Sequence, residues 1–317
     1  MLSKHITESL QWFERMAKQH IVTQSIVNRY LESNNISWDI LRTDLIHPIC
    51  SGNKFFKLKY YLLDALQKKY THLTTFGGAW SNHIVATAFA SRFCGLTATG
   101  IIRGERPAQL SETLTTALSE GMELNFLSRK EFANKSMQTT EDAGIYTIPQ
   151  GGYGIPGALG AGEMLRYAKQ EDYTHLVCAC GTGTMLAGLI RTYSTDLPLS
   201  ADKKARIPAF LGIAVLKDQS LPQKVAFLTQ SYTLPFRILH DFHFGGYAKK
   251  NEQLIDFMND FYSKQGIPTD FVYTGKLMYA VDQLIKSGYF APGSKILTIH
   301  SGGLQGNKSL KKGTLKY

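Results

Sequence analysis

One lysine near the amino end of the chain has the clearest potential for chemistry. Lys54 follows Ser51, Gly52 and Asn53, and residues 55–58 continue with the spacing of an amphipathic helix. A lysine amine becomes a useful nucleophile toward aldehydes when burial or neighbouring cations destabilise its ammonium form. The chain has 35 lysines and arginines, most of which must be solvated, so Lys54 alone does not identify a site.

Three glycine-rich turns supply the context that Lys54 needs. Each follows an apolar, β-branched run that predicts a strand, and the turns comprise residues 77–83, 181–184 and 301–303. Glycine at the end of a strand lets backbone N–H groups approach an anion, so we expect these turns to face a ligand. Each turn taken singly could equally be a structural strand-to-helix connection.

The second turn has the composition of a phosphate-binding loop. Gly181-Thr182-Gly183-Thr184 offers small residues and two hydroxyls immediately before a predicted helix. It lacks the lysine of a nucleotide-triphosphate loop, and no third glycine follows at the dinucleotide spacing. The sequence therefore favours a phosphate-bearing ligand that is neither ATP nor NAD.

Together these pieces resemble a known group of enzymes, the fold-type-II (tryptophan-synthase-β-like) enzymes that depend on pyridoxal phosphate. The similarity is greatest to the branch of 1-aminocyclopropane-1-carboxylate (ACC) deaminase and D-cysteine desulfhydrase, and it covers nearly the whole chain after about residue 36. The motifs that carry it, in chain order, are Arg42-Thr43-Asp44-Leu45, Ser51-Gly52-Asn53-Lys54, Gly78-Ala79-Trp80-Ser81-Asn82-His83, Ile148-Pro149-Gln150-Gly151-Gly152, Cys180-Gly181-Thr182-Gly183-Thr184, Val272-Tyr273-Thr274-Gly275-Lys276 and His300-Ser301-Gly302-Gly303.

The resemblance implies roles for particular residues. Lys54 would form the covalent imine with pyridoxal phosphate, and Gly181, Thr182, Gly183 and Thr184 would hold its phosphate with help from Asn82. The substrate carboxylate would be bound by Ser81, Asn82 and His83. Tyr273 and Tyr247 match the two tyrosines on the substrate face of the cofactor, and Ser81 joins them and Lys54 as a candidate catalytic residue.

The fold expected is α/β, because helical patterns alternate with short apolar strands and so predict a parallel sheet with helices on both faces. Helices are expected near residues 6–19 and 25–33, and a strand at 40–44. The resemblance implies a two-lobed, three-layer fold with a large cofactor-binding lobe (1–55 plus 158–317) and a small inserted lobe (56–157). The five glycines between 151 and 160 would form a hinge between the lobes. The resemblance also implies a homodimer.

Two reactions on small amino acids fit such a site. In the first, Lys54 removes the α-proton, a group on the β-carbon leaves, and hydrolysis gives a keto acid and ammonia, so that D-cysteine yields pyruvate and sulfide. In the second, ACC, which has no α-proton, is opened to 2-oxobutyrate and ammonia, and a tyrosine such as Tyr273 must take a more direct part. A third interpretation is a protein that binds the cofactor without turning over these substrates.

Two positions favour the elimination over the deaminase reaction. Thr274 stands where ACC deaminase has a glutamate, and Ser301 stands where it has a bulky apolar residue. A hydroxyl from either can bond a neutral pyridine nitrogen, which makes a weaker electron sink and suits the easier α-proton chemistry. Trp80 stands where the family usually has a glutamine, and its indole ring is expected to narrow or reshape the substrate pocket.

Composition indicates a soluble globular enzyme: the chain has 317 residues, of which 44% are apolar and 19% charged. No apolar run is long enough for a bilayer and no signal-peptide core is present, so we expect a cytoplasmic protein. The four cysteines have no zinc spacing, so no metal is expected, and Cys50 is more plausibly an inert thiol than a reactive one. The net charge of +10 is dispersed without a nucleic-acid motif, and the lysines after residue 307 are expected to form a solvated tail.

Overall fold

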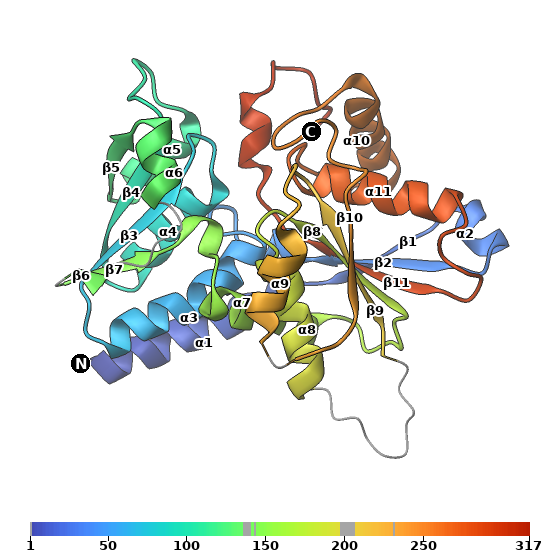
Figure 1. Cartoon of the computed structure of the whole chain (residues 1–317), viewed down its shortest axis with the longest axis horizontal. Coiled ribbons are helices and arrows are strands. Elements are labelled where there is room, and N and C mark those ends of the chain that lie inside the picture. The colour runs from blue at the N-terminus through green and yellow to red at the C-terminus, as the bar shows by residue number, and fades with distance from the viewer. Residues whose placement is uncertain (1, 136–140, 143, 197–206, 231) are drawn as a thin grey trace.

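The computed structural model describes residues 2–135, 141–142, 144–196, 207–230 and 232–317. Two sheets organise the molecule (Figure 1). The larger has six strands in the order β1-β2-β11-β8-β9-β10, namely β1 (Thr23–Ile26), β2 (Ser37–Arg42), β8 (His175–Cys180), β9 (Ala209–Ala214), β10 (Phe236–Leu239) and β11 (Lys295–His300). The smaller has the order β5-β4-β3-β7-β6, namely β3 (His72–Gly77), β4 (Thr97–Arg103), β5 (Met122–Leu127), β6 (Glu141–Asp142) and β7 (Ile145–Ile148).

Both sheets are parallel except at one edge each, where β1 pairs antiparallel with β2 and β6 with β7. The helices are α1 (Leu2–His20), α2 (Arg29–Ser33), α3 (Asn53–Gln67), α4 (Asn82–Phe93), α5 (Glu112–Ser119), α6 (Arg129–Lys135), α7 (Ile155–Gly162), α8 (Thr184–Asp196), α9 (Leu221–Thr229), α10 (Glu252–Gln265) and α11 (Thr274–Lys286). Short 3-10 turns occupy Thr43–Leu45, Gln150–Gly152, Glu163–Tyr167 and Leu304–Ser309. The expected α/β architecture with parallel-rich sheets is confirmed.

The large sheet is covered on both faces, which explains why its central strands read as continuous apolar runs. In β8, Leu176 and Cys178 belong to a core cluster shared with α8 and α9. Val177 and Ala179, which point the opposite way, belong to the cluster shared with α11. The alternation gives the three-layer arrangement of helices, sheet and helices. All strands of the small sheet lie between residues 56 and 157, the range expected for the inserted lobe, whose limits stay a prediction.

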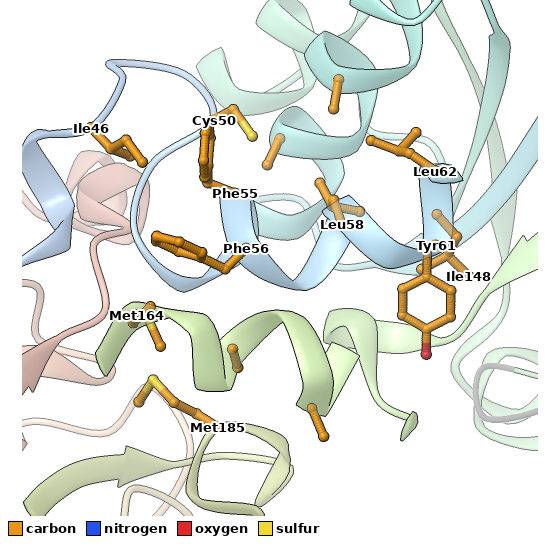
Figure 2. Close-up of a cluster of buried hydrophobic side chains, with 14 of the residues drawn as sticks. Ile46, Cys50, Phe55, Phe56, Leu58, Tyr61, Leu62, Ile148, Met164 and Met185 are labelled. Carbon is orange, nitrogen blue, oxygen red and sulfur yellow. The ribbon is translucent and has the colours of Figure 1, made fainter. Parts of the chain in front are cut away.

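The long helix α3 connects the two halves and carries Lys54 at its start. Figure 2 shows its apolar side chains, including Phe55 and Phe56, turned into the core, with Met164 and Met185 close by. The α7 helix lies against α3 with almost no separation, because a Cβ on Gly160 would come within 2.0 Å of the Phe56 carbonyl oxygen. Gly160 therefore serves close helix packing, and the hinge expected from the five glycines between 151 and 160 stays a prediction.

Two expectations about the amino-terminal part need correction. The predicted helix at 25–33 is wrong in its first half, because Thr23–Ile26 forms the edge strand β1 and α2 begins only at Arg29. Asn28 sets that start, since its side chain accepts a hydrogen bond from the Leu31 N–H. The strand expected at 40–44 begins earlier, at Ser37, and ends at Arg42. The α1 helix contains the predicted segment 6–19.

Cys50 lies within the core and is fully buried, and burial raises the pKa of its thiol well above the ordinary range. This agrees with an inert thiol.

Among the described residues, no helix combines the length and the apolar character needed to span a membrane.

Candidate active site

A cavity of about 680 Å³ opens where the strand ends of the two sheets face each other. It lies at the carboxyl ends of β3, β8 and β11, the usual place for a ligand in parallel sheets. Every site residue predicted from the sequence lines it. These are Lys54, Trp80, Ser81, Asn82, His83, Gly181, Thr182, Gly183, Thr184, Tyr247, Tyr273 and Ser301. The structure thus brings them together, while the role of each stays a prediction.

Lys54 is positioned by a glycine that no other residue could replace. Gly52 has φ +62°, and a Cβ there would lie 1.9 Å from the Ser301 carbonyl oxygen. The turn before α3 can therefore rest directly on the turn after β11, and the Asn53 N–H donates to that same carbonyl at 3.1 Å. Burial lowers the pKa of Lys54 to about 8, against an opposing effect of the Asp270 carboxylate. At neutral pH a minority of this amine is neutral, and hence nucleophilic, but this share is far larger than for an exposed lysine.

The turn 181–184 fits a phosphate group. Gly183 has φ +77°, and a Cβ there would clash with Val225, so the turn is held in a shape that glycine permits. The hydroxyls of Thr182 and Thr184 lie 2.8 Å apart at the start of α8, whose first N–H groups have no intrahelical acceptor. Hydroxyls, amides and a helix start form a donor set for an anion.

A second lysine completes this phosphate region and was missed by the sequence analysis. Lys57 lines the cavity from α3, and its ammonium group lies 3.4 Å from the Gly151 carbonyl oxygen. Burial, with a further contribution from the Lys54 charge, lowers its pKa well below the ordinary value. A buried cation of this kind is stabilised when a dianion binds beside it. Its spacing of three residues from Lys54, which places both on one helix face, was the available signal.

On the small-sheet side, the start of α4 faces the cavity. Ser81 precedes the helix without capping it through its side chain, which leaves the N–H groups of Asn82 and His83 to an incoming anion, whereas the Ile84 N–H donates to the Ser81 carbonyl. The His83 ring is nearly fully buried, and its Nε2 lies 2.7 Å from the Thr75 hydroxyl, which itself donates to the Ile148 carbonyl. Nε2 therefore carries the hydrogen, and Nδ1 is an acceptor.

This hydrogen bonding restricts what His83 can do. Burial, and then the charges of Lys54 and Lys57, lowers the pKa of His83 well below its ordinary value, so the ring is neutral. A neutral ring whose Nδ1 is an acceptor does not attract a carboxylate, so carboxylate binding by His83 would use its main-chain N–H. Within the described residues, His83 Nδ1 and Asn82 Oδ1 are buried without hydrogen-bond partners, which leaves both for a ligand.

On the large-sheet side, Tyr273 is held by a buried aspartate that the sequence analysis also missed. The Asp270 carboxylate accepts hydrogen bonds from the N–H groups of Val272, Tyr273 and Thr274 and from the Thr274 hydroxyl. Burial raises the pKa of Asp270, although these hydrogen bonds oppose the shift. Burial, then Tyr247 and Asp270, raises the pKa of Tyr273 well above its ordinary value, so its hydroxyl is a proton donor at neutral pH.

Tyr247 stands beside Tyr273, with ring centroids 6.2 Å apart in an edge-to-face arrangement. Lys276 holds the loop that carries Tyr247. Its buried ammonium group donates to the carbonyls of Val215, His243 and Gly246 at 2.8–3.1 Å, which ties the loop before Tyr247 to α11.

Thr274 and Ser301 differ in a way that the sequence could not show. The Thr274 hydroxyl is bonded to Asp270 and the residue does not line the cavity, so it is not available to a pyridine nitrogen. Ser301 does line the cavity. Of the two hydroxyls expected to compete for this role, Ser301 alone is placed for it.

The carboxyl-terminal segment, expected to be a solvated tail, packs behind Tyr273. The Tyr317 hydroxyl donates to the Thr269 carbonyl at 2.7 Å, and the Asn307 amide donates to the same oxygen at 2.9 Å. Leu315 and Tyr317 contact the apolar cluster that includes Phe271. The lysines of this segment are exposed, while the side chains of Asn307, Leu315 and Tyr317 pack against residues 269–271.

A family model described as pyridoxal-phosphate dependent enzyme matches residues 40–302. The chain belongs to this family. Its cofactor is pyridoxal phosphate, and the donor set around residues 181–184 with Lys54 and Lys57 fits that molecule. No group of three or more potential metal ligands occurs in the part of the chain that the structure describes.

Individual relatives place this enzyme within the family. It is 28% identical over 296 residues to a putative ACC deaminase of Thermotoga maritima, covering 88% of this chain and 93% of that one. It is also 28% identical over 307 residues to the bifunctional, mitochondrial D-cysteine desulfhydrase/ACC deaminase of Arabidopsis thaliana, covering 84% and 72%. A crystal structure of an ACC deaminase homologue superposes with TM-score 0.77 at 26% identity, covering 91% of this chain and 90% of that one. These similarities confirm the fold-type-II architecture and a deaminase or lyase of this kind.

Proposed function

We propose that this enzyme catalyses α,β-elimination from a small amino acid in the manner of a D-cysteine desulfhydrase. D-cysteine and water would give pyruvate, hydrogen sulfide and ammonia. The supporting observation is the environment available to the pyridine nitrogen. Ser301 offers a hydroxyl in the cavity, and the Asp270 carboxylate is already engaged by four hydrogen bonds. A neutral nitrogen suits a reaction that starts from an acidic α-proton.

Pyridoxal phosphate, when bound, supplies an electrophilic aldehyde and an electron-withdrawing ring. The protein supplies the rest. We propose that the amides at the start of α4 and the Ser81 hydroxyl orient the substrate carboxylate, and that the Lys54 amine, with its pKa near 8, accepts the α-proton. The Tyr273 hydroxyl would donate a proton to the departing sulfur, and Tyr247 would hold Tyr273 in place. Lys57 and residues 181–184 would hold the phosphate.

ACC deaminase is the second candidate function. Several relatives carry that name, and the structural neighbour is an ACC deaminase homologue. ACC and water would give 2-oxobutyrate and ammonia, and the paired tyrosines Tyr247 and Tyr273 are the groups that could act directly on the ring. The resemblance further implies a homodimer, which analytical ultracentrifugation would test. The cytoplasmic location expected from the composition would be tested by cell fractionation.

The test is to scan the visible absorbance of the purified protein with pyridoxal phosphate and then assay D-cysteine and ACC separately. Sulfide and pyruvate from D-cysteine, with little product from ACC, are expected. Lys54→Ala should lose both the cofactor absorbance and the product, whereas Lys68→Ala, at the exposed end of the same helix, should keep them. Production of 2-oxobutyrate from ACC at a higher rate would reject the elimination proposal and assign the deaminase.

A further inference from the structure

Two cationic side chains at the mouth of the cavity have no part in the site described so far. Arg103 lines the cavity from the small-sheet side, and Lys249 lines it from the large-sheet side. Both side chains are exposed. Within the described residues, neither has a hydrogen-bonding or ion-pair partner, so their charges are free to act on a ligand.

The other charged groups of the cavity are already accounted for. Lys54 and Lys57 serve the cofactor in the proposed function. Lys224 and Asp218 neutralise each other at 2.6 Å. The Asp270 carboxylate accepts hydrogen bonds from three backbone N–H groups of its own turn and from the Thr274 hydroxyl. The two mouth cations therefore exceed what the cofactor phosphate and the substrate α-carboxylate require.

The backbone places the two mouth cations on the substrate side of the cavity. Arg103 ends β4, and because Ile102 pairs with Gly77 in the parallel register, Arg103 lies beside the turn that carries Trp80. Lys249 is two residues beyond Tyr247 and lies against the loop that precedes Tyr247. A Cβ added to Gly245 of that loop would be 3.7 Å from the Lys249 Cβ. Trp80 and Tyr247 are the residues expected to surround the substrate side chain.

We propose that the substrate of this enzyme carries a second anionic group on its side chain, which binds between Arg103 and Lys249. The inference rests on the proposed function, since it assumes an amino acid held by its α-carboxylate at α4, and it narrows the substrate class. A guanidinium group suits this role because its paired N–H donors match two oxygens of a carboxylate or a phosphate. Amino acids of this class should bind better than D-cysteine.

Equilibrium binding separates charge from shape. Calorimetry on the holoenzyme with aspartate and asparagine, tested as both enantiomers, compares two ligands of the same size that differ in side-chain charge. Aspartate is expected to bind at least tenfold more tightly, and the difference should shrink as salt is added. The pair O-phosphoserine and serine then decides whether a phosphate or a carboxylate is the preferred anion.

The chain provides matched control variants. Arg103→Gln and Lys249→Gln should each reduce the aspartate-over-asparagine preference about three- to tenfold, and the double variant should abolish it. Arg106→Gln and Lys250→Gln remove neighbouring like charges that do not line the cavity. The two cations lie over the rings of Phe126 and Phe271. Both control variants should keep the preference of the unaltered enzyme.

Three results would overturn the inference: equal affinity for aspartate and asparagine, a preference that survives in the double variant, or an equal loss in the control variants. The last would trace the effect to the general positive field of the chain. Sulfide release from D-cysteine is assayed on the same unaltered preparation. Sulfide release without an anion preference rejects this inference alone, whereas neither amino-acid binding nor product would reject the proposed function too.

Discussion

The two walls of the cavity are built in opposite ways. The wall from the large sheet, residues 269–276, is internally fastened: Asp270 accepts four hydrogen bonds, and Lys276 donates three to loops nearby. The wall from the small sheet, residues 77–83, leads into a helix that the Ser81 side chain does not cap. Its buried acceptor atoms Asn82 Oδ1 and His83 Nδ1 have no hydrogen-bond partner among the described residues. Hydrogen bonds hold the groups of the first wall in place, which would suit the proposed proton transfer. The free polar groups of the second wall would suit the binding of a ligand.

Breaking the fastened wall should have the largest effect, and Lys276→Met does so most directly. The change removes three hydrogen bonds donated by a charged group, at about 1.5–3 kcal/mol each, although the His243 and Gly246 carbonyls keep backbone donors. It also releases a loop in which Phe244 and Ala248 hold positive φ angles of 53°. We expect the free energy of unfolding to fall by about 3 kcal/mol or more, measured by urea denaturation. Lys286→Met, on the exposed face of the same helix, should change it by less than about 0.5 kcal/mol. An equal loss of unfolding free energy in the two variants would show that the hydrogen bonds of Lys276 do not stabilise this wall.

Removing one hydroxyl from the fastened wall should reduce catalysis without unfolding the protein. Tyr273→Phe deletes the proposed proton donor, so kcat is expected to fall about 100-fold with little change in KM. The melting temperature should stay near that of the unaltered protein. Tyr289→Phe, at a partly exposed tyrosine remote from the cavity, is the control. A kcat within threefold of the original would exclude Tyr273 as the donor.

The wall from the small sheet should respond in substrate affinity rather than in stability. Ser81→Ala removes a hydroxyl that makes no side-chain cap, so its loss leaves the helix start unchanged. We expect KM to rise about tenfold and the free energy of unfolding to change by less than about 0.5 kcal/mol. Steady-state kinetics and urea denaturation on the same variant check both. A stability loss as large as that of Lys276→Met would contradict the contrast between the walls.

The pH dependence of cofactor uptake extends the comparison, because the Asp270 charge of the fastened wall raises the pKa of Lys54. Only the neutral amine attacks an aldehyde, and the pKa of Lys54 is lowered to about 8. The rate at which cofactor-free protein takes up pyridoxal phosphate should therefore rise with pH through a midpoint near 8. Asp270→Asn removes a charge that raises this pKa, so its midpoint should move lower, whereas Asp282→Asn should leave it in place. A midpoint above 10 would show that Lys54 is not desolvated.

Most of the cavity could be anticipated because its residues occupy the ends of strands. The apolar runs before Gly77, Gly181 and Ser301 are β3, β8 and β11, and parallel strands bring their carboxyl ends to one side. The edge strand β1 was missed because four residues with mixed polarity carry little periodic signal. Its pairing with β2 decides its conformation, and no local pattern reports that pairing.

Asp270, Lys57 and Lys276 show why the rest of the site was not predictable. In the sequence, each is an ordinary charged residue of a type that is usually exposed. Their importance comes from burial and from partners distant along the chain, such as Val215 and Gly246 for Lys276. The close contact of Gly160 with α3 could not be predicted for the same reason, since glycine permits both flexibility, as in the predicted hinge, and close packing.

The sequence by itself determined the alternation of helices and strands, the position of Lys54 at a helix start and the glycine turns, because these depend on residue type and short spacing. The tertiary structure alone decided which charged groups are buried and paired and which remain free. It committed Thr274 to Asp270, left Ser301 in the cavity, and placed the Arg103 and Lys249 side chains at its mouth without partners among the residues that the structure describes. The physical reason is that solvation and hydrogen bonding depend on neighbours in space, and those neighbours exist only after the chain has folded.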